Sequence, residues 1–383
     1  MESSELLPAT QVRELELPSA TRLDSLTGLR FLAALMVFAC HSEVLVALGL
    51  KNMVGYNHAT SQGASGVSFF FILSGFVLAW SARSSEARSA FWRRRGARIL
   101  PGYWFAWILG LGVVYVVNPE HQWHNALPGL VLLQSWIPKP ASYFGGNSVG
   151  WSLSAEAFFY ALFPLLIVVF RRWNERRQMI GVAVLLLAAI VWPLVLRPEA
   201  QNGIRYWLTY IFPPTRLLEF AVGMLLGLLF RSGRRSPVPF SVALLILVGA
   251  YIWDGFVPFY AGSVAVMVIP FALVIFTAAS VDVEQRPSFA RWPWLVKLGE
   301  WSYAFYLLHL LVITMAAWEL RNTHLSFAEA GAAVIGCLAV SIALSAFVFH
   351  YIEKPLERRF RHDRTVRATA APVTRAHLDR AVS

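Results

Sequence analysis

The chain has 383 residues and a formal net charge of +11, and 57% of its residues are hydrophobic while only 14% are charged. Soluble domains carry about one-quarter charged residues, so this composition excludes an ordinary soluble enzyme and predicts an integral protein of a lipid bilayer. The basic residues gather in short segments between apolar runs, which is typical of cytoplasmic loops and argues against a nucleic-acid-binding face.

Ten apolar stretches are long enough for membrane-spanning helices, each of which needs about 20 residues. They cover residues 26–48, 67–83, 99–117, 151–170, 179–196, 207–230, 238–254, 262–280, 302–319 and 328–352. We therefore predict an all-α, polytopic membrane protein. Its predicted parts are an N-terminal tail at 1–23, which lacks the apolar core of a signal peptide, a ten-helix membrane domain at 24–353 and a basic tail at 354–383.

Arginine and lysine are concentrated in every second loop between these spans. The basic loops lie at residues 83–98, 171–177, 231–235 and 286–297, and the C-terminal tail is basic as well. By the positive-inside rule, this alternation predicts that both termini are cytoplasmic and that the number of spans is even. The expected location is the inner or plasma membrane of the cell.

The first span carries two polar side chains, Arg30 and His41, where a simple membrane anchor would carry none. They are eleven residues apart, so they lie on nearly the same helix face, about 16 Å apart along the axis. A neutral imidazole in the outer half of the membrane could accept a proton from an alcohol as a general base. The alternatives are a hydrogen bond from His41 to a neighbouring helix and an Arg30 side chain that reaches back to the cytoplasmic surface.

A second cluster lies at the cytoplasmic start of the third span, in residues 91–104, FWRRRGARILPGYW. Arg95 and Arg98 share one face if the helix begins early enough, and two neighbouring guanidinium groups match the geometry of a phosphate. The alternative is an ordinary basic segment that only sets the topology. Pro101 is expected close to the start of the helix.

A third cluster lies where an outer loop enters the fourth span, in residues 146–164. Ser152 and Ser154 could cap this helix, and Glu156 is expected in its first turn, where the helix dipole favours a carboxylate. Because Glu156 enters from the same side of the membrane as His41, it could instead contact the imidazole and stabilise its protonated form. Capping and catalysis both remain open for Glu156.

Weaker signals come from the remaining segments. Gly66 in residues 66–76, GVSFFFILSGF, suggests close helix packing, and Arg216 could simply pair with Glu219, three residues on. In residues 299–309, GEWSYAFYLLH, we interpret the polar side chains as interfacial anchors rather than as catalytic groups; they are Ser302, Tyr303, Tyr306 and His309. The outer loop at 118–150 is expected at the membrane surface, partly folded back into the protein, with Trp123, Trp136 and Tyr143 at the interface.

These segments, in this order, resemble the acyltransferase-3 family of bacterial integral-membrane O-acyltransferases. The resemblance is carried by the Arg30–His41 spacing, GVSFFFILSGF, the Arg95–Arg98 pair, WSLSAEAFFY, the Arg216 block and SYAFYLLH. It implies acyl-CoA, such as acetyl-CoA, as a co-substrate, a hydroxyl-bearing acceptor, no permanently bound cofactor and no metal site.

The resemblance also implies roles for individual residues. His41 would accept the proton, and Arg30, Arg95 and Arg98 would belong to the donor site. From the topology argument above, we place Glu156 beside His41 as a second catalytic residue. We predict Ser154, Arg216 and Tyr306 as possible supporting residues.

Two questions remain open at this level. A proton-coupled transporter is the competing function, because buried His, Arg and Glu are also typical of such carriers. The acceptor hydroxyl could belong to a surface glycan, a lipid-linked sugar or a sugar-bearing metabolite such as a macrolide-type antibiotic.

Overall fold

The computed structural model describes residues 22–47, 56, 59–83, 87–120, 122–198, 203–258 and 264–362, and the account below is confined to them. These ranges contain helices and loops but no strand. The helices of eight or more residues are α1 (Asp24–His41), α4 (Gly66–Ser81), α5 (Arg88–Val117), α8 (Trp151–Arg171), α9 (Glu175–Leu196), α11 (Pro213–Arg231), α12 (Phe240–Asp254), α13 (Val264–Val283), α14 (Pro293–Leu320), α15 (Phe327–Val348) and α16 (Lys354–His362). The shorter helices are α2 (Glu43–Ala47), α6 (Leu127–Leu130), α7 (Pro140–Tyr143) and α10 (Gly203–Tyr206).

The all-α, polytopic prediction is confirmed. Within the described part of the chain, nine helical segments are long and apolar enough to cross a membrane. The seventh predicted span is α12, which has 15 residues. At 1.5 Å per residue that is about 22 Å, shorter than a hydrocarbon core of roughly 30 Å.

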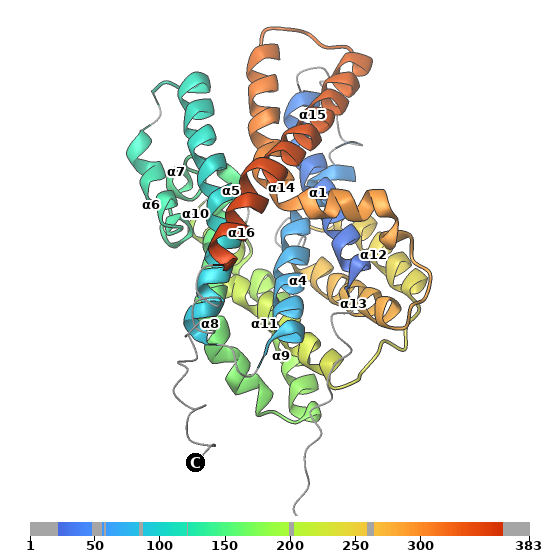
Figure 1. Cartoon of the computed structure of the whole chain (residues 1–383). Coiled ribbons are helices and arrows are strands. Elements are labelled where there is room, and N and C mark those ends of the chain that lie inside the picture. The colour runs from blue at the N-terminus through green and yellow to red at the C-terminus, as the bar shows by residue number, and fades with distance from the viewer. Residues whose placement is uncertain are drawn as a thin grey trace, which may run out of the picture.

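Helix α4 lies in the middle of the bundle, in contact with α1, α8, α11 and α13 (Figure 1). Its closest partner is α11, and glycines make this approach possible. A Cβ atom on Gly75 would lie 2.0 Å from the backbone oxygen of Phe220, and one on Gly223 would lie 1.9 Å from that of Ile72. The close packing inferred for the GVSFFFILSGF segment is therefore confirmed at Gly75, and also at Gly66, where a Cβ would lie 2.5 Å from the oxygen of Ala33.

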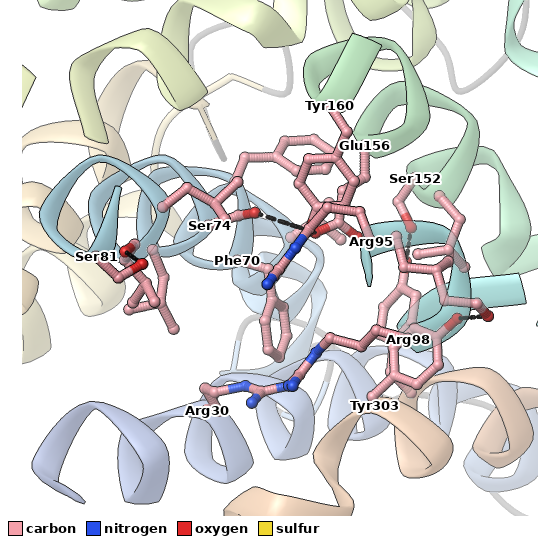
Figure 2. Close-up of a pocket in the computed structure, with 18 residues that line it drawn as sticks. Arg30, Phe70, Ser74, Ser81, Arg95, Arg98, Ser152, Glu156, Tyr160 and Tyr303 are labelled. Carbon is pink, nitrogen blue, oxygen red and sulfur yellow. Dashed lines mark hydrogen bonds between the residues drawn. The ribbon is translucent and has the colours of Figure 1, made fainter. Parts of the chain in front are cut away.

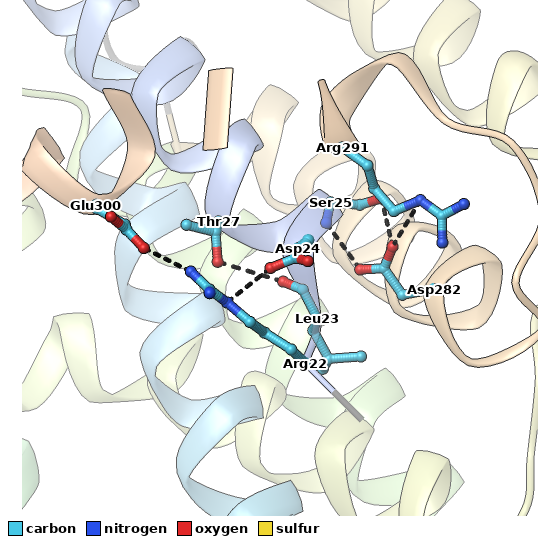
Figure 3. Close-up of polar contacts among 8 residues, drawn as sticks. All are labelled: Arg22, Leu23, Asp24, Ser25, Thr27, Asp282, Arg291 and Glu300. Atoms are coloured by element: carbon cyan, nitrogen blue, oxygen red, sulfur yellow. Dashed lines mark hydrogen bonds and ion pairs between the residues drawn. The ribbon is translucent and has the colours of Figure 1, made fainter. Parts of the chain in front are cut away.

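Helix α1 begins with a cap that comes from a distant part of the chain. Leu23, at the N-cap position, offers no side-chain hydrogen bond. Instead, the carboxylate of Asp282 on α13 accepts hydrogen bonds from the backbone N–H of Ser25 at 2.8 Å and from its hydroxyl at 2.6 Å (Figure 3). A carboxylate at a helix N-terminus satisfies free N–H groups and complements the dipole. The contact fixes the start of α1 against α13.

Several helix boundaries differ from the predicted ones. Helix α5 begins at Arg88, eleven residues before the apolar stretch at 99, because arginine is a good helix former and continues the helix outside the hydrocarbon. Pro101 consequently lies inside α5 rather than near its start. The sixth span is interrupted, since a π-helical turn at Trp207–Ile211 precedes Pro213, which opens α11 and has no N–H to continue a helix.

The first residues of the predicted basic tail at 354–383 form a helix. A π-helical turn, Phe349–Glu353, leads from α15 into α16, which packs against α5. Residues 363–383, and most of the N-terminal tail at 1–23, lie outside the described residues.

The loop at 118–150 folds back onto the helices, as expected. The Ser135 hydroxyl donates to the Trp151 oxygen at 2.7 Å, and the Ser135 oxygen accepts from the Trp207 indole at 2.8 Å. Trp123 is 68% exposed, as an interfacial residue would be, but Tyr143 is fully buried. The interfacial position predicted for Tyr143 is therefore wrong, because the loop folds back onto the helices and its Tyr143 ring is buried.

We expect Gly223→Ala to destabilise the protein by about 1–3 kcal/mol, because the new methyl group would overlap backbone atoms of α4. Thermal unfolding in detergent measures the effect. Gly336→Ala on α15 is the matched control, since a Cβ there meets nothing within 4 Å. Equal melting temperatures for the two variants would contradict the proposed importance of the close α4–α11 contact.

Candidate active site

A cavity of about 290 Å³ opens among α1, α4, α5, α8 and α14 (Figure 2). Its apolar wall includes Phe70 and Phe71 of α4. Its polar wall is formed by Arg30, Ser74, Ser81, Arg95, Arg98, Ser152, Glu156, Tyr160, Tyr303 and Tyr306. Every segment that the sequence singled out in the first, second, third, fourth and ninth spans therefore contributes to one cavity.

Among the described residues, three arginines and the carboxylate of Glu156 line this cavity, and the charge of Glu353, outside the lining, acts on Arg30 and Arg98. Arg95 and Arg98 lie one turn apart on α5, as their spacing predicted, and Figure 2 shows the side chains of Arg30 and Arg98 extending toward each other from α1 and α5. The buried Nε of Arg95 has no hydrogen-bond partner among the described residues. Three like charges in a partly apolar cavity repel one another, and a bound anion would relieve that repulsion.

The carboxylate of Glu156 belongs to this cavity and not to His41. It accepts hydrogen bonds from the Tyr160 hydroxyl, one turn along α8, and from the Ser74 hydroxyl of α4 at 3.1 Å. Helix α8 begins at Trp151, so Glu156 lies in its second turn rather than in the first. The predicted Glu156–His41 contact is wrong because that position on α8 faces α4. The Glu156–Tyr160 contact could have been predicted from the sequence, because residues four apart lie on the same face of a helix.

The partner of His41 is a second histidine. His41 Nδ1 lies 2.8 Å from Nε2 of His309 on α14, and the two rings stack with centroids 5.1 Å apart. This pairing follows from the extensive packing of α1 on α14. His309 is fully buried, whereas His41 is partly exposed. The sequence indicated His309 only as a polar residue within a span, although an intramembrane histidine is by itself a functional signal.

Tyr306 lies between the cavity and the histidine pair. Its hydroxyl hydrogen-bonds with that of Ser152 at 2.7 Å and donates to the Val149 oxygen at 3.2 Å. Its ring lies 5.9 Å from that of His309, centroid to centroid. Tyr306 and His309 are both buried, so the interpretation of these two residues as interfacial anchors is wrong.

Arg216 and Ser154 lie behind the cavity wall. Arg216 is fully buried, pairs with Glu219 at 3.1 Å and donates to the Ser68 hydroxyl at 3.0 Å. The Arg216–Glu219 pair that the sequence suggested is thus present. The Arg216 guanidinium also packs over Phe71, which lines the cavity. The Ser154 hydroxyl does not cap α8 but donates to the Leu132 oxygen at 2.6 Å, which fastens the outer loop.

A second cavity of about 240 Å³ adjoins the first and shares Leu78, Ser81 and Arg95 with it. Its described lining includes five arginines: Arg83, Arg88, Arg94, Arg95 and Arg171. The sequence assigned most of them only a topological role. Their convergence shows a basic entrance beside the main cavity.

Comparisons with known proteins show the family of the chain. A family model described as an acyltransferase domain matches residues 23–346. The chain is 37% identical to Acyltransferase MdmB of Streptomyces mycarofaciens over 377 residues, which is 93% of this chain and 97% of that protein. No solved structure matches the chain.

Two further relatives carry names that state a role. Peptidoglycan O-acetyltransferase OatA of Listeria monocytogenes is 26% identical over 371 residues, which cover 88% of this chain and 56% of that protein. Exopolysaccharide production protein ExoZ of Rhizobium meliloti is 29% identical over 329 residues, which cover 82% of this chain and 95% of that protein.

The family model and the relatives decide between the two functions that the sequence left open. They show an enzyme rather than a transporter. The chain belongs to the acyltransferase-3 family and is an O-acyltransferase of the membrane.

Proposed function

We propose that this enzyme transfers an acyl group, such as acetyl, from acyl-CoA to a hydroxyl group of a carbohydrate or a sugar-bearing metabolite at the bacterial cell membrane. The observation that carries the proposal is the cavity in which three arginines face one carboxylate. A donor with several phosphates supplies the negative charge that such a cavity favours.

The two adjoining cavities suit the two halves of acyl-CoA. The basic entrance, whose described lining includes five arginines, suits the phosphates. The main cavity shares Arg95 with the entrance, so its arginines suit the nearer phosphates, and its apolar wall at Phe70 and Phe71, with Tyr306 also in the lining, suits the thioester arm. In the proposed orientation, the thioester reaches the region of the histidine pair.

The proposed reaction is a direct transfer with His41 as general base. Its imidazole takes the proton of the acceptor hydroxyl while the hydroxyl oxygen attacks the thioester carbonyl carbon. The carbon–sulfur bond then breaks, and the leaving thiolate takes the proton from His41 to give free CoA. No acyl-enzyme intermediate is needed. Metal ions and permanently bound cofactors take no part in the proposed sequence.

The proposed topology has the donor entrance and both termini on the cytoplasmic side. Side chains of Arg171 and Arg231 both donate to the backbone oxygen of Ala82, so the ends of α4, α8 and α11 meet at one end of the bundle. Three loops that are basic in the sequence thus lie together. The positive-inside rule assigns such an end to the cytoplasm, where acyl-CoA is made.

The acceptor class is supported by what the relatives are called. One is named for O-acetylation of peptidoglycan and another for exopolysaccharide production. A surface glycan, a lipid-linked sugar and a macrolide-type antibiotic that bears a sugar all present a hydroxyl of this kind. Their shared chemistry is an alcohol on a carbohydrate ring.

We expect His41→Ala to lower acyl transfer by at least about 100-fold, the usual contribution of a general base. Transfer of labelled acetyl groups from acetyl-CoA to acceptors in native membranes measures it. His324→Ala is the control, because His324 is exposed in the loop before α15. A His41→Ala enzyme with full activity would refute the proposed mechanism.

We expect the double variant Arg95→Gln and Arg98→Gln to raise KM for acetyl-CoA by more than about 10-fold, since each charge-assisted hydrogen bond contributes roughly 1.5–3 kcal/mol. The control is Arg172→Gln, an exposed arginine outside both cavities. If the double variant and the control bind the donor equally well, these arginines do not hold the phosphates.

The acceptor is identified by mass spectrometry of extracts from cells that express either the wild type or His41→Ala. We expect a carbohydrate-bearing product that gains the mass of C2H2O, or of a longer acyl group, only in the wild-type extract. A product acylated on a molecule without a sugar would contradict the proposed acceptor class.

A further inference from the structure

The buried imidazole of His309 is held at both of its nitrogen atoms. Nε2 lies 2.8 Å from Nδ1 of His41, and Nδ1 lies 3.1 Å from the backbone oxygen of Phe305, one turn earlier on α14. The rings of Phe38, Phe305 and Tyr306 lie within 6.3 Å of the His309 ring, centroid to centroid. This aromatic surrounding leaves His309 fully buried.

The partners determine which nitrogen carries each proton. A backbone oxygen can only accept, so Nδ1 of His309 must be the N–H that points to Phe305. A neutral imidazole has one such proton, so Nε2 of His309 carries a lone pair and accepts. His41 must then donate from Nδ1, and the lone pair of neutral His41 is on Nε2.

We propose that His309 is a positioning residue for acyl transfer, which holds His41 in the tautomer whose Nε2 can accept the proton of the acceptor hydroxyl. The inference rests on the proposed role of His41 as general base. It assigns Nε2 as the reacting nitrogen and gives His309 the part that a carboxylate plays in many triads.

A neutral histidine suits this position. When His41 takes up a proton at Nε2, its Nδ1–H continues to donate to His309, so no hydrogen bond is lost during the reaction. His309 cannot pass the proton on, because its other nitrogen already donates to the Phe305 oxygen. A neutral partner also avoids an anion buried in hydrocarbon, which would be costly.

Two substitutions separate orientation from packing. His309→Leu removes the acceptor but fills the space, and we expect kcat to fall on the order of 100-fold with KM for acetyl-CoA unchanged. His309→Gln keeps an acceptor oxygen for His41 and should recover much of the lost kcat. Ile313→Ala, also buried on α14, is the control that reduces packing and should leave kcat unchanged.

The tautomer itself is observed by ¹⁵N NMR of histidine-labelled protein in nanodiscs, with the His41 signals assigned from their loss in His41→Ala. We expect a protonated Nδ1 and a bare Nε2 on His41 in the wild type and in His309→Gln, and growth of the opposite tautomer in His309→Leu.

Two results would overturn the proposal. One is a bare Nδ1 on His41 in the wild type, and the other is a kcat of His309→Leu equal to that of Ile313→Ala. The proposed function fails separately, if His41→Ala stays active. An inactive His41→Ala together with a fully active His309→Leu would remove only the positioning role.

Discussion

Burying a charge in hydrocarbon is costly unless the charge is paired, and this constraint governs how the protein is built. Arg216 is fully buried, and the carboxylate of Glu219, the hydroxyl of Ser68 and the ring of Phe71 all contact its guanidinium. The arginines of the main cavity are different, because three of them share the described lining with a single carboxylate, Glu156, which already accepts two hydrogen bonds. This incomplete pairing supports the proposed binding of an anionic donor.

The scaffold and the site share the same central helix. Gly75 lets α4 approach the backbone of α11, while Ser74, next to it in the chain, turns to Glu156, and Phe70 and Phe71 line the cavity. Gly75 therefore brings α11 close to α4, and Phe70, Phe71 and Ser74 shape the main cavity. Substitutions in α4 would be expected to affect stability and donor binding together.

The cavity and the histidine pair are two parts of one site with Tyr306 between them. The cavity has positive charge and an apolar wall, whereas the pair joins a partly exposed imidazole to a buried one. In the proposed reaction, this separation lets donor and acceptor approach from different sides of the membrane. His309 occupies the place beside His41 that the sequence offered to Glu156.

The sequence alone determined the membrane class, the approximate spans and the helix face shared by Arg95 and Arg98, because hydropathy and helical periodicity are local properties. It also indicated the Arg216–Glu219 pair, whose members lie within one turn. Only the tertiary structure decided the partners of His41 and Glu156. The His41–His309 and Glu156–Ser74 contacts join residues 268 and 82 positions apart. Helical periodicity shows which residues share a face, but only the packing of the helices decides which neighbour that face contacts.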